Sequence, residues 1–266
     1  MNEGRGKAPD PLPEWRRRAY LDAMGIPLWV PRDAPAGPAP AGAGPSAGEA
    51  RAEGTASTAP RAPVDATPPA TDGGAAASGD VAGMDWDTLR NTILGCSLCD
   101  LCQSRTQAVP GVGNRHAELL VIGEAPGQEE DRRGEPFVGR AGQLLDRMLA
   151  AIGLDRDTVF ITNVLKCRPP KNRDPGPEEA LACGPYLRRQ IELIEPKIIL
   201  SVGRVSAQQL LETSEAIGRL RGRWHAFGPQ STPLLVTYHP AYLLRSPGEK
   251  RKAWQDLKMV RDRLRE

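Results

Sequence analysis

The sequence LLVIGEAPG at residues 119–127 decides the fold class, because it joins a short apolar run to a turn rich in Gly and Pro. The run at 119–122 predicts a buried strand, and the residues after it predict a loop at the strand's carboxyl end. Open α/β sheets bind their ligands at that edge. Gly123 and Gly127 let the backbone approach a ligand closely, and Glu124 can position a water molecule or a polar group. The stretch predicts a binding loop or, as the alternative, an ordinary strand-to-helix turn with solvated carboxylates.

Further apolar runs predict three more strands, at residues 159–164, 197–202 and 234–238. Apolar residues at helical spacing predict the intervening helices, at residues 140–152, 177–195, up to 211 and 249–266. Asp85 is expected to cap one more helix ahead of the first strand. Strands that alternate with helices indicate an α/β fold with a mostly parallel sheet covered on both faces. The candidate site residues then follow strands, at one edge of the sheet.

The composition is uneven along the 266 residues. Residues 34–83 are dominated by Ala, Gly and Pro and carry only Val64 and Val81 as larger aliphatic side chains. Such a segment buries too little apolar surface to offset its conformational entropy, so we predict a disordered linker there. The sequence therefore divides into a short helical docking peptide at residues 1–33, the linker, and one folded domain at residues 84–266.

Net charge and hydropathy say little about the partner. The net charge is +2, and Arg and Lys cluster near the later site stretches and in the last helix. Such clusters suit a phosphate backbone and equally suit a solvated surface. We find no signal peptide and no apolar run long enough to cross a membrane, so we expect a cytoplasmic protein without a membrane partner. In that compartment the five cysteines are not expected to form disulfides.

The cysteine spacing is the most specific signal for a bound metal. Cys96 and Cys99 form a C-x2-C pair, and Cys167 and Cys183 lie far downstream. Four cysteines of a cytosolic protein in this pattern indicate zinc or an iron–sulfur cluster. A zinc ribbon normally carries a second close C-x2-C pair, which is absent. Cys102 is a fifth candidate that can replace Cys99 on spacing alone, and five buried free thiols are the structural alternative.

Two later stretches complete the candidate site. Asn163 lies in TNVLKCRPP at residues 162–170, at the end of the second predicted strand. Its side chain offers a donor and an acceptor and can pair with an amide-like edge, such as O4 and N3–H of uracil. His239 opens HPAYLLR at residues 239–245, directly after the fourth strand. The alternatives are a turn-forming Asn and a structural His.

The residues after His239 suit a nucleic acid. Leu243 and Leu244 are apolar and can wedge into a base stack, and Arg245 can hold a phosphate group.

At this point a family resemblance is clear. GEAPG at 123–127, the stretches at 162–170 and 239–245, and the four-cysteine spacing together resemble family 4 uracil-DNA glycosylases, the iron–sulfur members of their superfamily. The resemblance covers residues 85–266, with four motifs in the same order. It implies a three-layer α/β/α sandwich with a four-stranded, mostly parallel sheet. It also implies a DNA repair enzyme that hydrolyses the N-glycosidic bond between uracil and deoxyribose and leaves an abasic site.

The resemblance assigns roles to the residues that would touch uracil. Phe137 would stack on the flipped base, and Asn163 would read its Watson–Crick edge. His239 would donate to O2 of the departing uracil anion, and Glu124 would lie near the sugar and the attacking water.

The resemblance also assigns supporting residues. Glu130 and Asn172 would form a supporting polar pair. Ala125 stands where other branches carry a water-activating Asp, which excludes strong general-base catalysis from that position. A [4Fe–4S] cluster is then favoured over zinc, with Cys96, Cys99, Cys167 and Cys183 as its ligands.

Two alternatives belong to other classes of function. One is a non-catalytic iron–sulfur DNA-binding or replisome adaptor protein of the same fold, although all three candidate catalytic residues are intact. The other is a zinc-binding structural module. Separately, RRRAYLDAMGIPLW at residues 16–29 resembles the amino-terminal peptide of the psi subunit of bacterial DNA polymerase III, which binds the clamp loader. The alternative for this peptide is a folded-back helix or a degenerate remnant. We expect a monomer whose partners are uracil-containing DNA and the replicative clamp loader.

Overall fold

The computed structural model describes residues 81–266. The docking peptide predicted at residues 1–33 and nearly all of the predicted linker lie outside this range. The last linker residues form a short 3₁₀ turn, η1 (Val81–Gly83), in which Val81 packs against a small apolar core beside Leu89 and Tyr186. The folded part therefore includes at least three residues of the segment predicted as linker.

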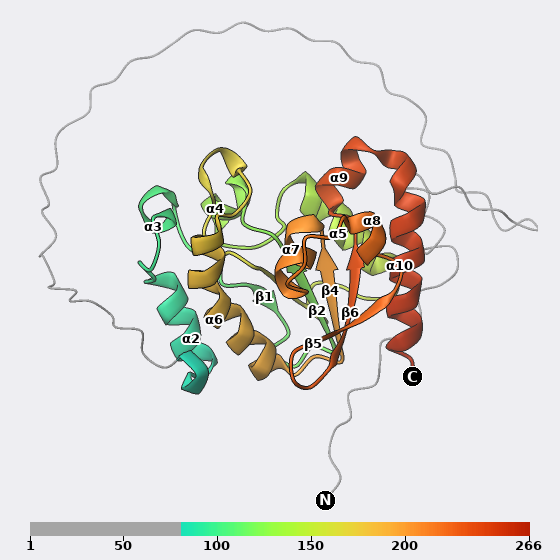
Figure 1. Cartoon of the computed structure of the whole chain (residues 1–266), viewed down its shortest axis with the longest axis horizontal. Coiled ribbons are helices and arrows are strands. Elements are labelled where there is room, and N and C mark those ends of the chain that lie inside the picture. Colours follow the sequence, from blue (N-terminus) through green and yellow to red (C-terminus); the bar gives the residue numbers. More distant parts are fainter. Residues whose placement is uncertain (1–80) are drawn as a thin grey trace, which may run out of the picture. The chain divides into compact units, whose positions relative to one another are not determined.

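A six-stranded mixed sheet forms the centre of the fold, with strand order β1-β3-β2-β4-β6-β5 (Figure 1). The four predicted strands form its parallel middle and are β2 (Leu119–Gly123), β3 (Phe160–Asn163), β4 (Ile198–Val202) and β6 (Thr232–Thr237).

The expected four-stranded sheet needs correction, because an antiparallel strand lies at each edge. These edge strands are β1 (Val112–Gly113) and β5 (Trp224–Phe227). β1 has only two residues, and β5 is partly exposed, so neither carries the buried apolar run that marks the central strands.

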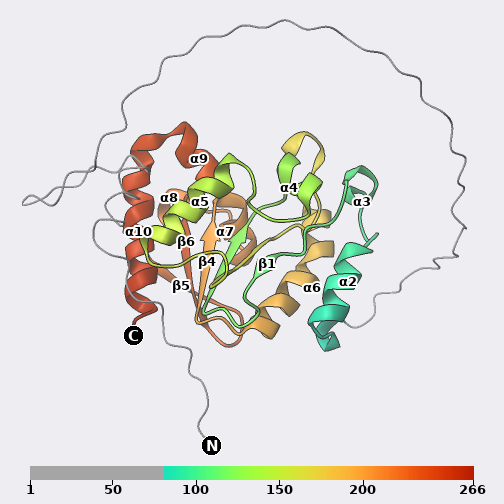
Figure 2. The same ribbon diagram turned by 180° about the vertical axis from the view of Figure 1, so that it is seen from behind.

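Helices cover both faces of the sheet, as the expected three-layer sandwich requires. One face packs against α5 (Arg140–Ala151), α9 (Pro240–Arg245) and α10 (Lys250–Arg263). The other face packs against α6 (Pro177–Ile194), α7 (Arg204–Leu210) and α8 (Ile217–Leu220). The two layers are seen from opposite sides in Figures 1 and 2.

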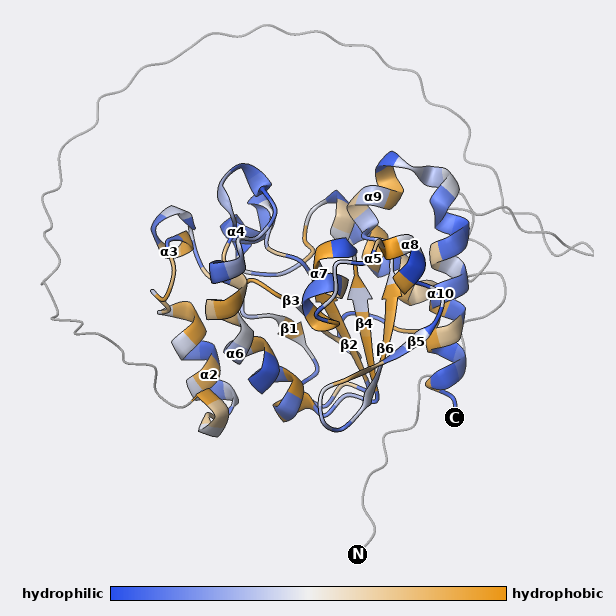
Figure 3. Ribbon diagram, in the orientation of Figure 1, coloured by the Kyte–Doolittle hydropathy of each residue, from blue (hydrophilic) through white to orange (hydrophobic). Residues whose placement is uncertain are grey.

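The longer helices form where apolar spacing and end signals agree. Asp85 caps α2 (Trp86–Leu94) by accepting a 2.8 Å hydrogen bond from the Thr88 N–H, as the sequence predicts. α6 starts at Pro177, and Glu179 reaches back to accept from the Gly176 N–H at 2.7 Å. Hydropathy colouring shows apolar strands in the middle layer, covered by helices whose outer faces are polar (Figure 3). Burial of these apolar stripes therefore fixes the layers.

Two further short helices lie near the strand ends. α4 (Gln128–Arg133) reads QEEDRR and lacks an apolar stripe, so no helical pattern predicts it. α3 (Leu101–Ser104) carries Cys102 and follows the segment that holds Cys96 and Cys99. No helix within residues 81–266 combines the length and apolar character that a membrane crossing needs.

The parallel middle of the sheet brings three chain segments to one edge. Gly123 pairs with Asn163 at the ends of β2 and β3, and Thr237 at the end of β6 pairs with Val202 at the end of β4. The loops that follow β2, β3 and β6 consequently leave the same edge of the sheet, with β2 beside β3 and with β4 between β2 and β6.

Candidate active site and cysteine pocket

A pocket of about 420 Å³ opens at the carboxyl edge of the sheet. The predicted residues that line it are Glu124, Ala125, Gly127, Glu130, Phe137, Asn163, Asn172, His239 and Arg245. The structure therefore brings together the three residues expected to be catalytic, which come from the ends of three different strands.

Asn163 occupies the floor of this pocket and is 2% exposed. A Cβ atom on Gly123 would lie 2.4 Å from Asn163 Oδ1 and 2.6 Å from Phe137 Cζ, so only glycine fits beneath these two side chains. The absent side chain at Gly123 is therefore a requirement of the pocket. Burial raises the pKa of the neighbouring Glu124, and the Asp174 carboxylate adds to that rise.

His239 is held as a neutral hydrogen-bond donor. The Ala241 N–H donates to His239 Nδ1 at 3.1 Å, which assigns the ring proton to Nε2. Burial, and then the positive charge of Arg245, lower the pKa of His239 from 6.5 to about 4. At neutral pH the imidazole therefore presents one N–H donor and no net charge.

The Phe137 loop is fixed by contacts from several sides. Phe137 has a left-handed backbone (φ 55°), an uncommon conformation for a side chain of its size. Arg156 donates to the Phe137 and Pro136 carbonyl oxygens at 3.0 and 2.7 Å, and Gly142 lies so close that a Cβ would be 1.7 Å from the Phe137 oxygen. The Phe137 ring stacks on His239 with 5.5 Å between ring centroids. These contacts thus hold a strained backbone in place, which sets the Phe137 ring at the pocket wall.

Glu130 and Asn172 both line the pocket, but each bonds to a different partner. Glu130 Oε1 accepts from the Val138 and Gly139 N–H groups at 3.0 and 3.2 Å, which closes the Phe137 loop. Asn172 Oδ1 accepts from Arg168 Nε at 2.8 Å.

The structure changes one expectation about the residues after His239. Leu243 is 1% exposed and packs in the core on the α5 and α10 side of the sheet. It is therefore not available to enter a base stack, which corrects the sequence-based assignment. Leu244 is 37% exposed, and Tyr242, which lines the pocket, is 36% exposed.

Sequence reasoning missed two charged residues of the pocket, Arg173 and Asp174. Arg173 pairs with Glu179, and Asp174 pairs with Arg204 at 2.5 Å. Their only signal is that they directly follow Asn172. Together these pairs hold the loop after β3 against the start of α6 and α7.

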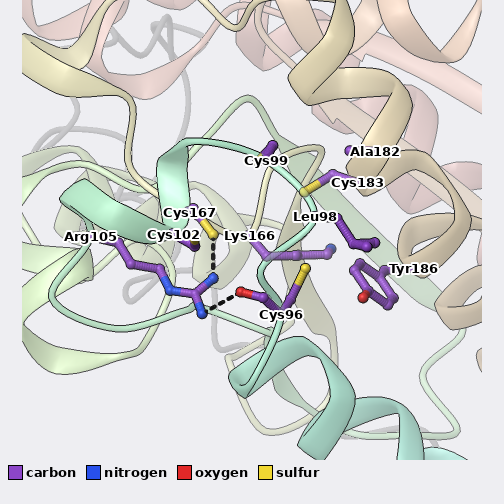
Figure 4. Close-up of a pocket in the computed structure, with 10 residues that line it drawn as sticks. All are labelled: Cys96, Leu98, Cys99, Cys102, Arg105, Lys166, Cys167, Ala182, Cys183 and Tyr186. Carbon is purple, nitrogen blue, oxygen red and sulfur yellow. Dashed lines mark hydrogen bonds between the residues drawn. The ribbon is translucent and has the colours of Figure 1, made fainter. Parts of the chain in front are cut away.

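A second, smaller pocket gathers all five cysteines (Figure 4). Cys96 and Cys99 come from the segment between α2 and α3, Cys102 from α3, Cys167 from the loop after β3, and Cys183 from α6. Cys167 and Cys183 are 3% and 4% exposed. Burial raises the pKa of the Cys99 thiol and raises that of Cys183 to about 11. Within residues 81–266, no three Cys, His, Asp or Glu side chains are arranged to hold a metal ion.

Arg105 joins the separate cysteine segments. Its guanidinium donates to Cys167 Sγ at 2.8 Å and to the Cys96 carbonyl oxygen at 2.8 Å (Figure 4). It also donates to the Leu94 carbonyl oxygen at 3.1 Å. Burial raises the pKa of Cys167, and the nearby positive charge of Arg105 opposes that rise. Arg105 is thus the group of this pocket that favours negative charge on the Cys167 sulfur, against the effect of burial.

Comparison with known proteins agrees with this geometry. Residues 110–258 match the model of the uracil DNA glycosylase superfamily. The type-4 uracil-DNA glycosylase of Archaeoglobus fulgidus is 46% identical over 184 residues, which cover 65% of this chain and 90% of the relative. The enzyme of Sulfurisphaera tokodaii is 45% identical over 66% of this chain and 83% of the relative. The enzyme of Saccharolobus solfataricus is 46% identical over 67% of this chain and 86% of the relative. The chain belongs to the uracil-DNA glycosylase superfamily and, within it, to the type-4 family.

Proposed function

We propose that this protein hydrolyses the N-glycosidic bond between uracil and deoxyribose in DNA and leaves an abasic site. The observation that carries the proposal is that Glu124, Asn163 and His239, from three strand ends, line one pocket. Bases inside a duplex are out of reach of such a pocket, so the uracil must leave the stack before it reacts.

Base recognition falls to the pocket floor and wall. The Asn163 amide supplies one acceptor and two donors, which match O4 and N3–H of uracil. Phe137 stacks on the base, and its strained, fully supported loop supplies a preorganised surface. Gly123 leaves room for the base to lie against the strand end.

Bond cleavage depends on stabilising the uracil anion. Negative charge develops on O2 as the glycosidic bond breaks, and His239 Nε2–H donates a hydrogen bond to that oxygen. The donor is neutral and only partly exposed, so the hydrogen bond acts in a poorly solvated site where it is stronger than in water. Glu124 orients the attacking water near the sugar. Ala125 has no group that could act as a base, so departure of the anion carries most of the catalysis.

The DNA backbone would be held at the rim. Arg245 lines the pocket beside His239 and supplies a positive charge for a phosphate. Leu244, which is exposed at the end of α9, fills the gap left by the flipped base.

We further propose that the cysteine pocket holds a [4Fe–4S] cluster on Cys96, Cys99, Cys167 and Cys183. A single zinc ion with bonds of about 2.3 Å brings its thiolates to within about 4 Å of one another. The four thiolates of a four-iron cluster each bind a different iron, and these four cysteines come from three chain segments around one pocket. The cluster would supply covalent bonds between the two cysteine segments and α6.

The alternative of a non-catalytic DNA-binding or replisome adaptor has less support. Such a protein would not need Glu124, Asn163 and His239, and all three are present in one pocket. For the segment at residues 1–33, we propose binding to another protein, with the clamp loader as the candidate partner. We also propose that the enzyme is a cytoplasmic monomer.

We expect His239→Ala and Asn163→Ala each to lower the rate of uracil excision roughly a hundredfold or more, because each removes a hydrogen bond to the developing anion. The measurement is single-turnover cleavage of a uracil-bearing oligonucleotide. His116→Ala is the matched control, since that side chain is exposed and lies outside the pocket. Wild-type rates in both pocket variants would refute the proposal.

Excision should not decline as the pH falls through 6.5, the ordinary pKa of histidine. The folded pKa of His239 is lowered to about 4, so its neutral, working form persists above that value and is lost below it. The pH profile is measured for wild type and for Glu124→Gln, because the raised pKa of Glu124 adds an acid limb of its own. An inflection near 6.5 that survives in Glu124→Gln would contradict the neutral donor.

Cys167→Ser should remove iron and visible absorption, because it removes a proposed cluster ligand. It should also abolish excision, because Cys167 lies four residues beyond Asn163 on the same loop. Cys102→Ser is the control and should keep its iron, whereas Cys99→Ser should lose it. Iron is measured by metal analysis of the full-length protein. Full activity in Cys167→Ser would refute the structural role of the cluster. Iron loss in Cys102→Ser but not in Cys99→Ser would show that Cys102, and not Cys99, is the ligand.

Residues 1–33 should be needed for recovery of clamp-loader subunits in a pull-down with the purified protein. The reason is that an apolar, Trp-bearing peptide separated from the domain by some fifty Ala-, Gly- and Pro-rich residues suits docking to another protein. Equal recovery by full-length protein and by protein without these residues would dismiss this contact.

A further inference from the structure

Lys166 lies between the cysteine pocket and the active-site loop, and the proposed mechanism leaves it without a role. It directly precedes Cys167, lines the cysteine pocket (Figure 4), and is 1% exposed, which makes it the largest fully buried side chain of the described residues. A lysine is rarely buried so completely unless its charge is paired. The complete burial of Lys166 therefore needs a specific explanation.

The hydrogen bonds of Lys166 account for every donor of an ammonium group. Nζ donates to Thr162 Oγ1 at 2.8 Å, to the Asn163 carbonyl oxygen at 2.7 Å and to Gln190 Oε1 at 2.7 Å. A protonated amine has three N–H donors, whereas a neutral amine has two. Three short contacts to oxygen atoms therefore indicate the charged form.

The three acceptors are themselves fixed in place. Thr162 Oγ1 and Gln190 Nε2 both donate to the Pro110 carbonyl oxygen, at 3.0 and 2.6 Å. The network thus ties β3 to α6 and to the segment that leads into β1. The Asn163 main chain is held from this network on one side and by its pairing with β2 on the other.

No carboxylate within residues 81–266 forms an ion pair with Lys166. The groups beside Lys166 that can carry negative charge are the cysteines that line the same pocket. A buried ammonium group needs a counter-charge, which metal-bound thiolates in this pocket would supply.

We propose that Lys166 is a positioning residue that couples the cysteine pocket to base recognition: the anionic cysteine-bound cluster stabilises its ammonium group, which in turn holds the Asn163 main chain. This inference rests on the proposed function, since it needs both the cluster and uracil excision. Loss of the ammonium would leave the Asn163 carbonyl oxygen without its buried side-chain donor and Gln190 Oε1 with only the Thr162 hydroxyl at 3.2 Å.

The test uses full-length Lys166→Met, which keeps the length of the side chain and removes its charge. We expect kcat/KM for a uracil oligonucleotide to fall about ten- to a hundredfold, as for unsatisfied buried acceptors. The reduction potential of the cluster should move to more negative values, because a nearby positive charge that favours the reduced, more negative state is gone. A purely structural role would leave that potential unchanged. Unchanged kcat/KM and unchanged potential in Lys166→Met would overturn the proposal.

Two further variants separate the possible outcomes. Thr162→Val removes one acceptor of Lys166 and keeps its charge, so it should lower kcat/KM while the potential stays at the wild-type value. If Lys166→Met assembles no cluster, Thr162→Val decides: full excision with bound iron would refute the coupling. Lys197→Met is the matched control, because Lys197 is exposed and pairs with Glu118 at the amino ends of the strands. Both kcat/KM and the reduction potential of this variant should match wild type. Absence of iron or of excision in the wild-type protein would instead refute the proposed function.

Discussion

The pairing of β2 with β3 at their carboxyl ends is the constraint on which the site depends. Gly123 and Asn163 are partners in the parallel ladder, and the pairing continues beyond the strands through Val164 N–H to the Gly123 oxygen at 2.9 Å and Leu165 N–H to the Glu124 oxygen at 3.0 Å. Two loops that would otherwise diverge are therefore hydrogen-bonded to each other as they leave the sheet. A side chain at Gly123 would collide with Asn163, so the ladder and the missing Cβ together set the pocket floor.

The same ladder connects the active site to the cysteine pocket. The backbone that leaves β3 reaches Cys167 four residues after Asn163, and Arg105 fixes Cys167 to the segment that carries Cys96. A change in the cysteine pocket is thus a change in the backbone that presents Asn163.

The sequence is informative where burial and pattern coincide. The central strands are apolar runs bounded by Gly, Pro or polar residues, and the residues that follow them reach one edge because parallel strands must end together. Edge strand β1 and helix α4 carry no such pattern, so they could not be predicted. Leu243 and Leu244 are neighbours in one motif, but a rotation of one residue along α9 puts the first in the core and the second in solvent. Arg105 was missed because its contact to Cys167 spans 62 residues and leaves no local signal.

The electrostatics of the site follow from its burial. A buried imidazole gives up its charge, and the Ala241 N–H fixes the proton on Nε2, so His239 offers a donor without the cost of holding a cation in a poorly solvated site. An imidazolium would bind an anion more strongly in principle, but Arg245 already supplies positive charge beside it and further disfavours a second cation. The pocket therefore divides the work between a neutral, oriented hydrogen bond at the base and a full positive charge at the rim. In the proposed mechanism, the fixed inner donor provides selectivity for the leaving group, and the exposed charge of Arg245 provides affinity for DNA.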